Sequence, residues 1–260
     1  MPTIDPTFVE VNTATFAGSV VRSIGLLDAH VAPYIRVWPL AVSVVSGTIY
    51  PFNHVAGICD AAQIGPIHAD YPHERAPFAL ECAPQCHSAA DLIAYRDLGL
   101  APVSESLVLA CDLTHQQPPH VRSNLVWSEN DGLEVTTDYV PADSERIIRR
   151  AYALQPDATI VSLLHSDGII ASAGIRIAEG YAFCFGAWVA PHRRRRGHYT
   201  TLLDARLRYA AEHDCHTIIL QTQARSAVAA AAEARGFRHV WTRERWMEVH
   251  QQKRSIHRDT

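Results

Sequence analysis

Residues 192–203 read HRRRRGHYTTLL, four arginines running into a glycine and then into a stretch of helical character. The apolar run that precedes them, residues 181–189 (YAFCFGAWV), is typical of a buried strand. Residues 200–214 follow the arginines and place apolar side chains along one helical face. The arginines are therefore predicted to lie in a short loop between a strand and a helix.

A basic loop in this position suits a ligand that carries phosphate. The first turn of a helix presents N–H groups without intrahelical acceptors, together with the positive end of the helix dipole. Gly197 lets the backbone approach a ligand closely, and the arginines supply charge and forked donors. The segment lacks the Gly-Lys-Ser/Thr of a nucleotide-hydrolase loop and the three glycines of a dinucleotide fingerprint.

Two other interpretations of the arginines are a solvated basic turn and a nucleic-acid patch. The 260 residues carry a formal net charge of −4 and the sequence pI is about 6.4, whereas nucleic-acid-binding proteins usually have a basic excess. No basic surface interleaved with aromatic residues accompanies the run. The pattern favours the phosphate loop over the solvated turn, and the solvated turn over nucleic acid.

The second half of the chain predicts strands and helices in a regular order. Asp167-Gly168 between two apolar runs indicates a hairpin, and Gly236 after an alanine-rich run suits a left-handed helix end. The expected elements are a strand at 133–140, a helix at 145–154, strands at 159–165, 168–177 and 181–189, a helix at 200–214, a strand at 217–222, a helix at 226–235 and a strand at about 239–249.

The first half contains a fainter copy of the end of this series. A strand at 77–83, a helix at 88–98 and a strand at 103–113 surround Gly99, which lies 236 − 99 = 137 residues before Gly236. The pattern indicates a tandem repeat. Further upstream, residues 13–24 suggest a helix and residues 41–50 a strand.

The stretch from Val189-Ala-Pro191 through Arg194 and Gly197 to Leu202-Leu203 resembles motif A of the GCN5-related N-acetyltransferase (GNAT) superfamily. In that motif a strand ending in Val-x-Pro precedes Gln/Arg-x-x-Gly-x-Gly/Ala and a helix with Leu-Leu. The later strand, helix, Gly236-Phe237 and strand are similar to motif B, and the two motifs cover about residues 133–249. The resemblance implies an α/β (α+β) fold of two GNAT-like domains, each a mixed, mostly antiparallel central sheet flanked by helices. Residues 1–125 would form a degenerate domain and residues 126–260 the domain that binds acetyl-CoA.

The resemblance also implies an activity and its site. An N-acetyltransferase would transfer the acetyl (acyl) group of acetyl-CoA to a primary amine of a small molecule or peptide by direct attack. The end of the strand would separate from its neighbour and bind the pantetheine arm and the acetyl carbonyl, and the loop would bind the pyrophosphate. The implied cofactor-binding residues are Ala187, Trp188, Val189, Arg194, Arg195, Arg196, Gly197, His198, Tyr199 and Thr200.

Two departures from the family pattern bear on catalysis. Tyr199 stands where motif A ends in Gly or Ala, and Ala232 stands where the family often has a proton-donating tyrosine, four residues before Gly236. Tyr95 has the corresponding position in the first half and is interpreted as a packed aromatic. These departures keep open an alternative, a catalytically silent acyl-CoA-binding or interaction protein of the same fold. No catalytic residue is assigned, because the strand-end residues Glu179, His165 and His192 are of a kind found more often at the surface than as a general base.

The remaining features define compartment and partners. Six scattered cysteines indicate reduced thiols, and Cys82–Cys86 lacks the second ligand pair of a zinc site, so no metal is expected. Histidines with His-x-x-x-His spacing are absent. No apolar run approaches the ~20 residues of a membrane span, and the start lacks a secretory leader. A cytoplasmic protein without nucleic-acid or membrane partners is expected, and a homodimer is left open.

Overall fold

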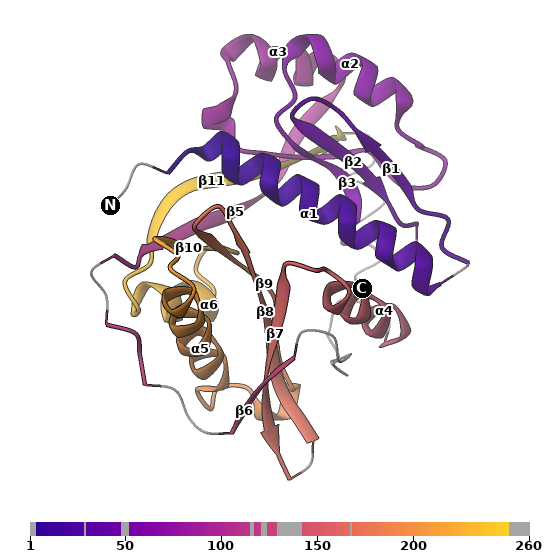
Figure 1. Ribbon diagram of the computed structural model, residues 1–260. Coiled ribbons are helices and arrows are strands. Elements are labelled where there is room, and N and C mark those ends of the chain that lie inside the picture. The colour runs from indigo at the N-terminus through magenta and orange to yellow at the C-terminus, as the bar shows by residue number, and fades with distance from the viewer. Residues whose placement is uncertain are drawn as a thin grey trace. The chain divides into compact units, whose positions relative to one another are not determined.

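The computed structural model describes residues 4–28, 30–47, 52–114, 117–120, 124–128, 142–166 and 168–249, with side chains of α4 from residue 146. The chain divides into two compact units (Figure 1). The first unit comprises residues 4–106 with 241–249, and the second comprises residues 107–240. Each unit contains parallel and antiparallel strands flanked by helices.

The second unit carries the arginine loop. Its strands follow the order β5-β10-β9-β8-β7-β6, in which β9 and β10 are parallel and the neighbouring pairs on either side are antiparallel. The strands are β5 (Leu100–Asp112, from residue 107 in this unit), β6 (Leu125–Ser128), β7 (Ala158–His165), β8 (Gly168–Ala178), β9 (Tyr181–Val189) and β10 (Thr217–Thr222). The helices are α4 (Ala142–Ala153), α5 (His198–Glu212) and α6 (Ala227–Glu233).

Helices α4 and α5 cover opposite faces of this sheet (Figure 1). Successive side chains of a strand point to opposite faces, and β7 shows this directly. Val161 packs with Leu202 of α5, whereas Ile160 packs with Tyr152 of α4. The side chains of the Val161 face therefore pack against α5, the helix that follows the arginine loop.

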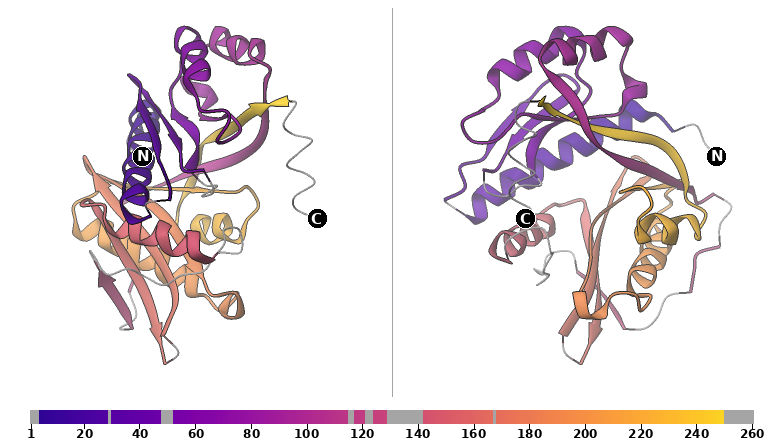
Figure 2. Two further views of the ribbon diagram at one scale, coloured as in Figure 1. Left: turned by 90° about the vertical axis from the view of Figure 1, so that its right-hand side faces the viewer. Right: turned by 180° about the vertical axis from the view of Figure 1, so that it is seen from behind.

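The first unit has the same kind of construction. Its strand order is β1-β2-β3-β4-β11, with β3 and β4 parallel. Gly18 of α1 packs on Val42 of β2, whereas the adjacent Ala41 faces the cluster formed with α2 and α3, so the helices cover both faces (Figure 2). The elements are α1 (Pro6–Leu27), β1 (Tyr34–Val37), β2 (Ala41–Val45), β3 (Asn53–Gly57), α2 (Ala61–Asp70), β4 (Ala79–Cys82), the 3-10 turn Pro84–Cys86, α3 (Ala89–Asp97) and β11 (Arg238–Glu248).

The two units do not coincide with the two halves of the sequence. Residues 107–112 of β5 belong to the first half of the chain but pair with β10 of the second unit. Conversely, β11 lies near the end of the chain, and its segment 244–247 pairs with β4 of the first unit. The predicted division at residues 125/126 differs from the structural divisions at 106/107 and 240/241, because local patterns mark a strand without saying which sheet it joins.

Most expected elements are present, with small shifts at their ends. Both repeated glycines end helices in the left-handed conformation, with φ of 76° at Gly99 and 85° at Gly236. The helix expected at 13–24 is longer, because Asp5 caps it at the N–H of Thr7. The strand expected at 41–50 ends at Val45. The strand expected at 133–140 lies outside the described residues, and the four-residue β6 was missed because it is too short to show alternation.

Candidate functional site

The arginine loop reaches α5 through two left-handed residues. Arg195 has a φ of 61° and Gly197, the N-cap of α5, a φ of 81°. A Cβ at Gly197 would meet nothing within 4 Å, so the glycine is favoured by backbone conformation rather than by lack of space. Arg195 lacks that freedom, and a left-handed non-glycine residue costs about 1–2 kcal/mol. Strain of this kind is commonly kept at functional sites.

The start of α5 has no carboxylate on it. Helix α5 lies wholly within the described residues; its N-cap Gly197 offers no side chain, and its first turn holds no acidic residue. The turn begins with His198, Tyr199 and Thr200, whose N–H groups precede the helical hydrogen-bond ladder. The helix dipole adds roughly half a positive charge at this end. The exposed Arg194, Arg195 and Arg196 stand directly before it, so the site attracts anions.

Parallel strands β9 and β10 separate at their carboxyl ends. Their pairing runs from Tyr181 opposite Thr217 to Cys184 opposite Leu220. Beyond that point β9 continues to Val189, whereas the last residues of β10 pair with β5. Within the described strands, no residue of β9 after Cys184 is in register with β10. The predicted separation is therefore present, and it opens beside the start of α5.

A bulge in β9 lies on the edge of this separation. Ser172 of β8 pairs with Trp188 and Gly174 pairs with Phe185, so Gly186 and Ala187 together face a single residue of β8. Gly186 has a φ of 56°, and both bulge residues are exposed. A bulge turns backbone N–H and C=O groups out of the regular ladder. The expected contact point at Ala187 is thus an irregular, accessible piece of backbone.

Three polar side chains meet where the strands separate. Arg206 of α5 is fully buried, and its guanidinium lies 5.7 Å from the centre of the Tyr199 ring. Its Nε donates to the Leu202 carbonyl at 3.3 Å, but neither Nη atom has a hydrogen-bond partner within the described part of the chain. The buried Tyr199 hydroxyl also lacks one at standard geometry. Cys184, the last residue of β9 in register with β10, completes the cluster.

The charge of Arg206 acts on both neighbours. Burial raises the pKa of the Tyr199 hydroxyl, and the guanidinium opposes this by a smaller amount. Burial likewise raises the pKa of the Cys184 thiol, with Arg206 again acting in the opposite direction. A buried cation with unpaired donors is costly, and it favours any group that accepts hydrogen bonds or develops negative charge beside it.

Ala232 of α6 has no hydroxyl at the position where the family often has a tyrosine. It is fully buried in an apolar cluster with Leu203 and Phe237, and Tyr199 packs against the same cluster. The two residues that depart from motifs A and B therefore border or belong to one apolar cluster. The sequence does not link residues 199 and 232, because they are distant along the chain.

Trp188 lies on the opposite face of the sheet. It packs with Ile160 and Tyr152, and the Arg149 guanidinium lies 5.4 Å from the centre of its ring. Its side chain is a core aromatic under α4, so only its backbone shares the strand edge with Ala187 and Val189. Of the ten expected site residues, Trp188 is the one whose side chain is buried away from α5.

The candidates for a general base occupy different ends of the sheet. Glu179 is in the turn before β9, and Val189 ends that strand eight residues after Tyr181, roughly 26 Å at ~3.3 Å per residue. That distance places Glu179 far from the loop. His165 ends β7, with its Nδ1 3.0 Å from the Ser166 hydroxyl, and the exposed His192 is in the 3-10 turn Pro191–Arg193. The two histidines remain at the end of the sheet that carries the loop.

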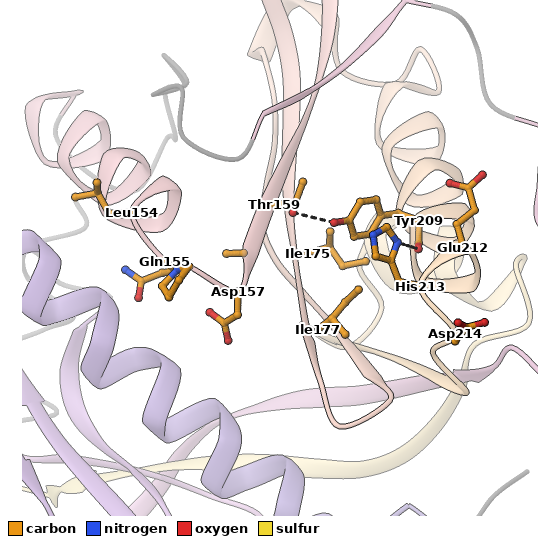
Figure 3. Close-up of a pocket in the computed structure, with 12 residues that line it drawn as sticks. Leu154, Gln155, Asp157, Thr159, Ile175, Ile177, Tyr209, Glu212, His213 and Asp214 are labelled. Carbon is orange, nitrogen blue, oxygen red and sulfur yellow. Dashed lines mark hydrogen bonds between the residues drawn. The ribbon is translucent and has the colours of Figure 1, made fainter.

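A pocket of about 870 Å³ lies at the other end of α5 (Figure 3). Its wall includes Tyr209, whose hydroxyl is 3.0 Å from that of Thr159, as well as His213 and Asp157. Tyr209 follows His198 by eleven residues, or about 16 Å of helix at 1.5 Å per residue. The pocket is therefore separate from the arginine-flanked start of α5, where backbone and arginine side chains are exposed.

The corresponding helix start in the first unit is closed by carboxylates. The 137-residue offset places Ala61 of α2 on His198 (198 − 137 = 61), and α2 also follows a parallel strand. Asp60 accepts from the N–H groups of Ala62 and Gln63, and Asp91 accepts from that of Ala61 at 2.6 Å. Two carboxylates thus cap the first N–H groups of α2, whereas α5 has no acidic residue in its first turn, and the charge of these carboxylates repels phosphate.

Tyr95 and the six cysteines have the surroundings of residues that stabilise the fold. Tyr95 is fully buried against Trp246, and its hydroxyl donates to the Cys59 carbonyl, which agrees with its interpretation as a packed aromatic. All six cysteines are described and none forms a disulfide. Cys82 ends β4 and Cys86 ends a 3-10 turn, the ordinary strand end and turn expected for this pair. No helix in the described ranges has both the length and the apolar character that a membrane crossing requires.

Comparison with known proteins supports the resemblance seen in the motifs. The model of the acetyltransferase (GNAT) family matches residues 125–237. A GCN5-related N-acetyltransferase from Kribbella flavida has 14% identity and a TM-score of 0.57, with 91% of this chain and 95% of that chain covered. A tandem GNAT protein from the clavulanic acid biosynthesis pathway has 12% identity and a TM-score of 0.55, with 92% and 94% covered.

At these identities the solved structures show a shared fold and nothing finer. The search of curated proteins finds no match. The family model and the motif-bearing loop fall on the same segment of the chain, the strand–loop–helix unit of β9 and α5. Residues 125–237 are therefore similar to the acetyltransferase (GNAT) family, and the solved structures share a fold with most of the chain.

Proposed function

We propose that the second unit binds acetyl-CoA and transfers its acetyl group to a primary amine of a small molecule or peptide. The observation that carries the proposal is the junction of two features: the uncapped, arginine-flanked start of α5 and the separation of β9 from β10 after Cys184. The first suits a pyrophosphate, and the second suits a narrow polar arm that hydrogen-bonds to a strand edge. A generic phosphate site would need only the first.

The residues would act mainly by binding and orientation. Acetyl-CoA supplies the acyl group in the activated form of a thioester. The loop from Arg194 to Thr200 would hold the phosphates, and backbone groups of β9 near the Ala187 bulge would hold the arm and polarise the acyl carbonyl. Fixing donor and acceptor side by side converts a bimolecular attack into a nearly unimolecular one. The C–N bond forms as the C–S bond breaks, and the amine proton must leave.

Tyr199 is our candidate for protonating the sulfur of the leaving group. Its hydroxyl is buried, its side chain packs against the cluster that contains Ala232, and Arg206 lies over its ring. The guanidinium would stabilise the negative charge of a tyrosinate after proton transfer. Tyr199→Phe should lower kcat by about 100-fold, the lower range for acid–base catalysis, and leave acetyl-CoA affinity unchanged. Tyr209→Phe, on the same helix but at the distant pocket, is the matched control and should leave kcat unchanged.

We further propose a tandem arrangement in which the first unit is a degenerate copy. Support comes from the shared series of strand, helix, glycine and strand, and from the carboxylates of Asp60 and Asp91 at the start of α2. Those carboxylates make the first unit unsuited to pyrophosphate. It would shape the acceptor side or serve only to stabilise the protein.

A catalytically silent acyl-CoA-binding protein is the second candidate, favoured by the alanine at position 232. Calorimetric titration with acetyl-CoA and thiol release with a panel of primary amines separate the two functions. Saturable binding with amine-dependent thiol release supports the transferase. Binding without turnover on any amine favours the silent protein. Absence of binding would overturn the interpretation of the loop itself.

A further inference from the structure

A second cluster of reactive side chains lies in the first unit. His68 near the end of α2, His73 in the following turn and Glu248 at the end of β11 come together there. We propose that these three residues form a binding site for one divalent transition-metal ion of the Zn²⁺ class. The proposal does not depend on the acetyltransferase function.

The distances suit a single small cation. His68 Nε2 lies 3.0 Å and His73 Nδ1 lies 3.7 Å from the same oxygen, Glu248 Oε1. All the ligand atoms lie within 4.8 Å of one another. Atoms bonded at ~2.0–2.1 Å to a tetrahedral zinc ion are about 3.3–3.4 Å apart. Small side-chain rotations are enough to place the three donors around one ion.

The imidazole of His73 is already oriented for this role. Its Nε2 lies 2.8 Å from the His68 carbonyl, so the ring N–H donates there and the lone pair is left on Nδ1, the atom facing the cluster. A histidine that binds a metal ordinarily donates its other ring N–H to a carbonyl or carboxylate, which fixes both tautomer and orientation. A histidine serving only as a surface base would not need this anchor.

The aromatic ring of Phe78 packs against the imidazole rings of both His68 and His73. Phe78 is fully buried, and its ring centre lies 4.7 Å from that of His68 and 6.0 Å from that of His73. The two imidazoles are themselves 4.6 Å apart in an edge-on arrangement. Side chains held in this way lose little further freedom when a metal binds, which raises affinity.

The donor set selects the class of metal and leaves room for another ligand. Two imidazoles and one carboxylate suit zinc and related ions, whereas magnesium and calcium prefer sites made of oxygen. The three side chains are 22%, 35% and 23% exposed, so a fourth position faces solvent. A bound ion would tie the end of β11 to α2 within the first unit. The sequence concealed the site, because Glu248 is 180 residues from His68.

The test uses the full-length chain without an affinity tag, stripped of metal with a chelator. We expect zinc, titrated against a chromogenic competitor, to bind at one equivalent per chain, and cobalt to give the intense visible bands of a four-coordinate site. His68→Ala and Glu248→Gln should each weaken binding at least ~10-fold, the lower range for disturbing a metal site. His30→Ala, an exposed histidine of the same unit, is the matched control and should bind like the unmodified protein.

Circular dichroism of each variant shows whether it is folded. His73→Gln provides a second test, because the 3.7 Å separation of His73 Nδ1 from Glu248 Oε1 is longer than the 3.0 Å contact of His68 and its loss should disturb the fold less. The proposal is overturned if the unmodified protein has no saturable equivalent, if cobalt gives only the weak bands of six-coordinate ions, or if folded variants retain full affinity.

Discussion

The buried guanidinium of Arg206 leads to a prediction that separates stability from activity. We consider Arg206→Met, which keeps a long unbranched side chain but removes the charge and the nitrogen donors. Arg206 is fully buried, and among the described residues neither Nη atom has a hydrogen bond of standard geometry, although the guanidinium lies beside the Tyr199 hydroxyl. The substitution should therefore stabilise the ligand-free protein and at the same time reduce the proposed acetyltransferase activity.

The magnitude follows from two opposing effects. Removing the hydrogen bond from Nε to the Leu202 carbonyl costs about 1 kcal/mol. Removing buried donors without partners gains about 1–3 kcal/mol, and more for a charged group. Replacement of buried ionic groups by apolar residues of similar volume is often neutral or stabilising by about 1–4 kcal/mol. We expect a net stabilisation of about 1–3 kcal/mol.

Urea denaturation followed by circular dichroism measures the change. With a slope of about 2–3 kcal/mol per molar, a gain of about 2 kcal/mol moves the midpoint up by about 0.7–1 M at unchanged slope. Arg208→Met is the control on the same helix. Arg208 forms an exposed pair with Glu212 at 2.7 Å, and its loss should change the stability by no more than about 0.5 kcal/mol.

Activity is expected to move in the opposite direction. If the guanidinium is retained to stabilise charge near Tyr199, the folded Arg206→Met protein should release thiol more slowly than the unmodified protein. A destabilisation of several kcal/mol would contradict this prediction, because it would mean that the guanidinium has hydrogen-bond partners in the folded protein. Higher stability with full activity would show that Arg206 has no part in the site.

Three further predictions concern single residues. Gly197→Ala should lower the free energy of unfolding by about 1–2 kcal/mol, because the φ of 81° is unfavourable for alanine. Calorimetry should also show weaker acetyl-CoA binding, and unchanged affinity would contradict the proposed role of the loop. Glu10→Gln removes the carboxylate charge 2.9 Å from the buried Arg243, and should lower the free energy of unfolding in urea by about 3–5 kcal/mol. Burial raises the pKa of Glu81, but nearby cations including Arg245 at 2.8 Å outweigh it and hold that pKa below its usual value. The ionised Glu81 therefore stabilises the protein above the unfolded-state pKa of about 4.3, and this stabilisation is lost as pH falls through the lower folded-state pKa. Glu81→Gln should reduce the fall in the free energy of unfolding at acid pH. An unchanged fall would show that the Glu81–Arg245 pair does not cause it.

The strand, loop and helix around the arginines could be predicted from the sequence because their signals are local. The apolar run of β9, the glycine of the loop and the apolar face of α5 act within a few residues of one another. The turn before β9 is equally local, since Glu179 and Gly180 both have a positive φ, at 49° and 77°. The family resemblance rested on these same short-range features.

The local sequence pattern is thus enough to place the arginine loop and the helix that follows it. The assembled fold was needed to show which strands β5 and β11 pair with, that Arg206 is buried beside Tyr199, and that Glu248 meets two histidines. Strand and helix signals depend on the conformational preferences of consecutive residues. Burial and side-chain clusters depend on contacts between distant segments, and those form only when the sheets assemble.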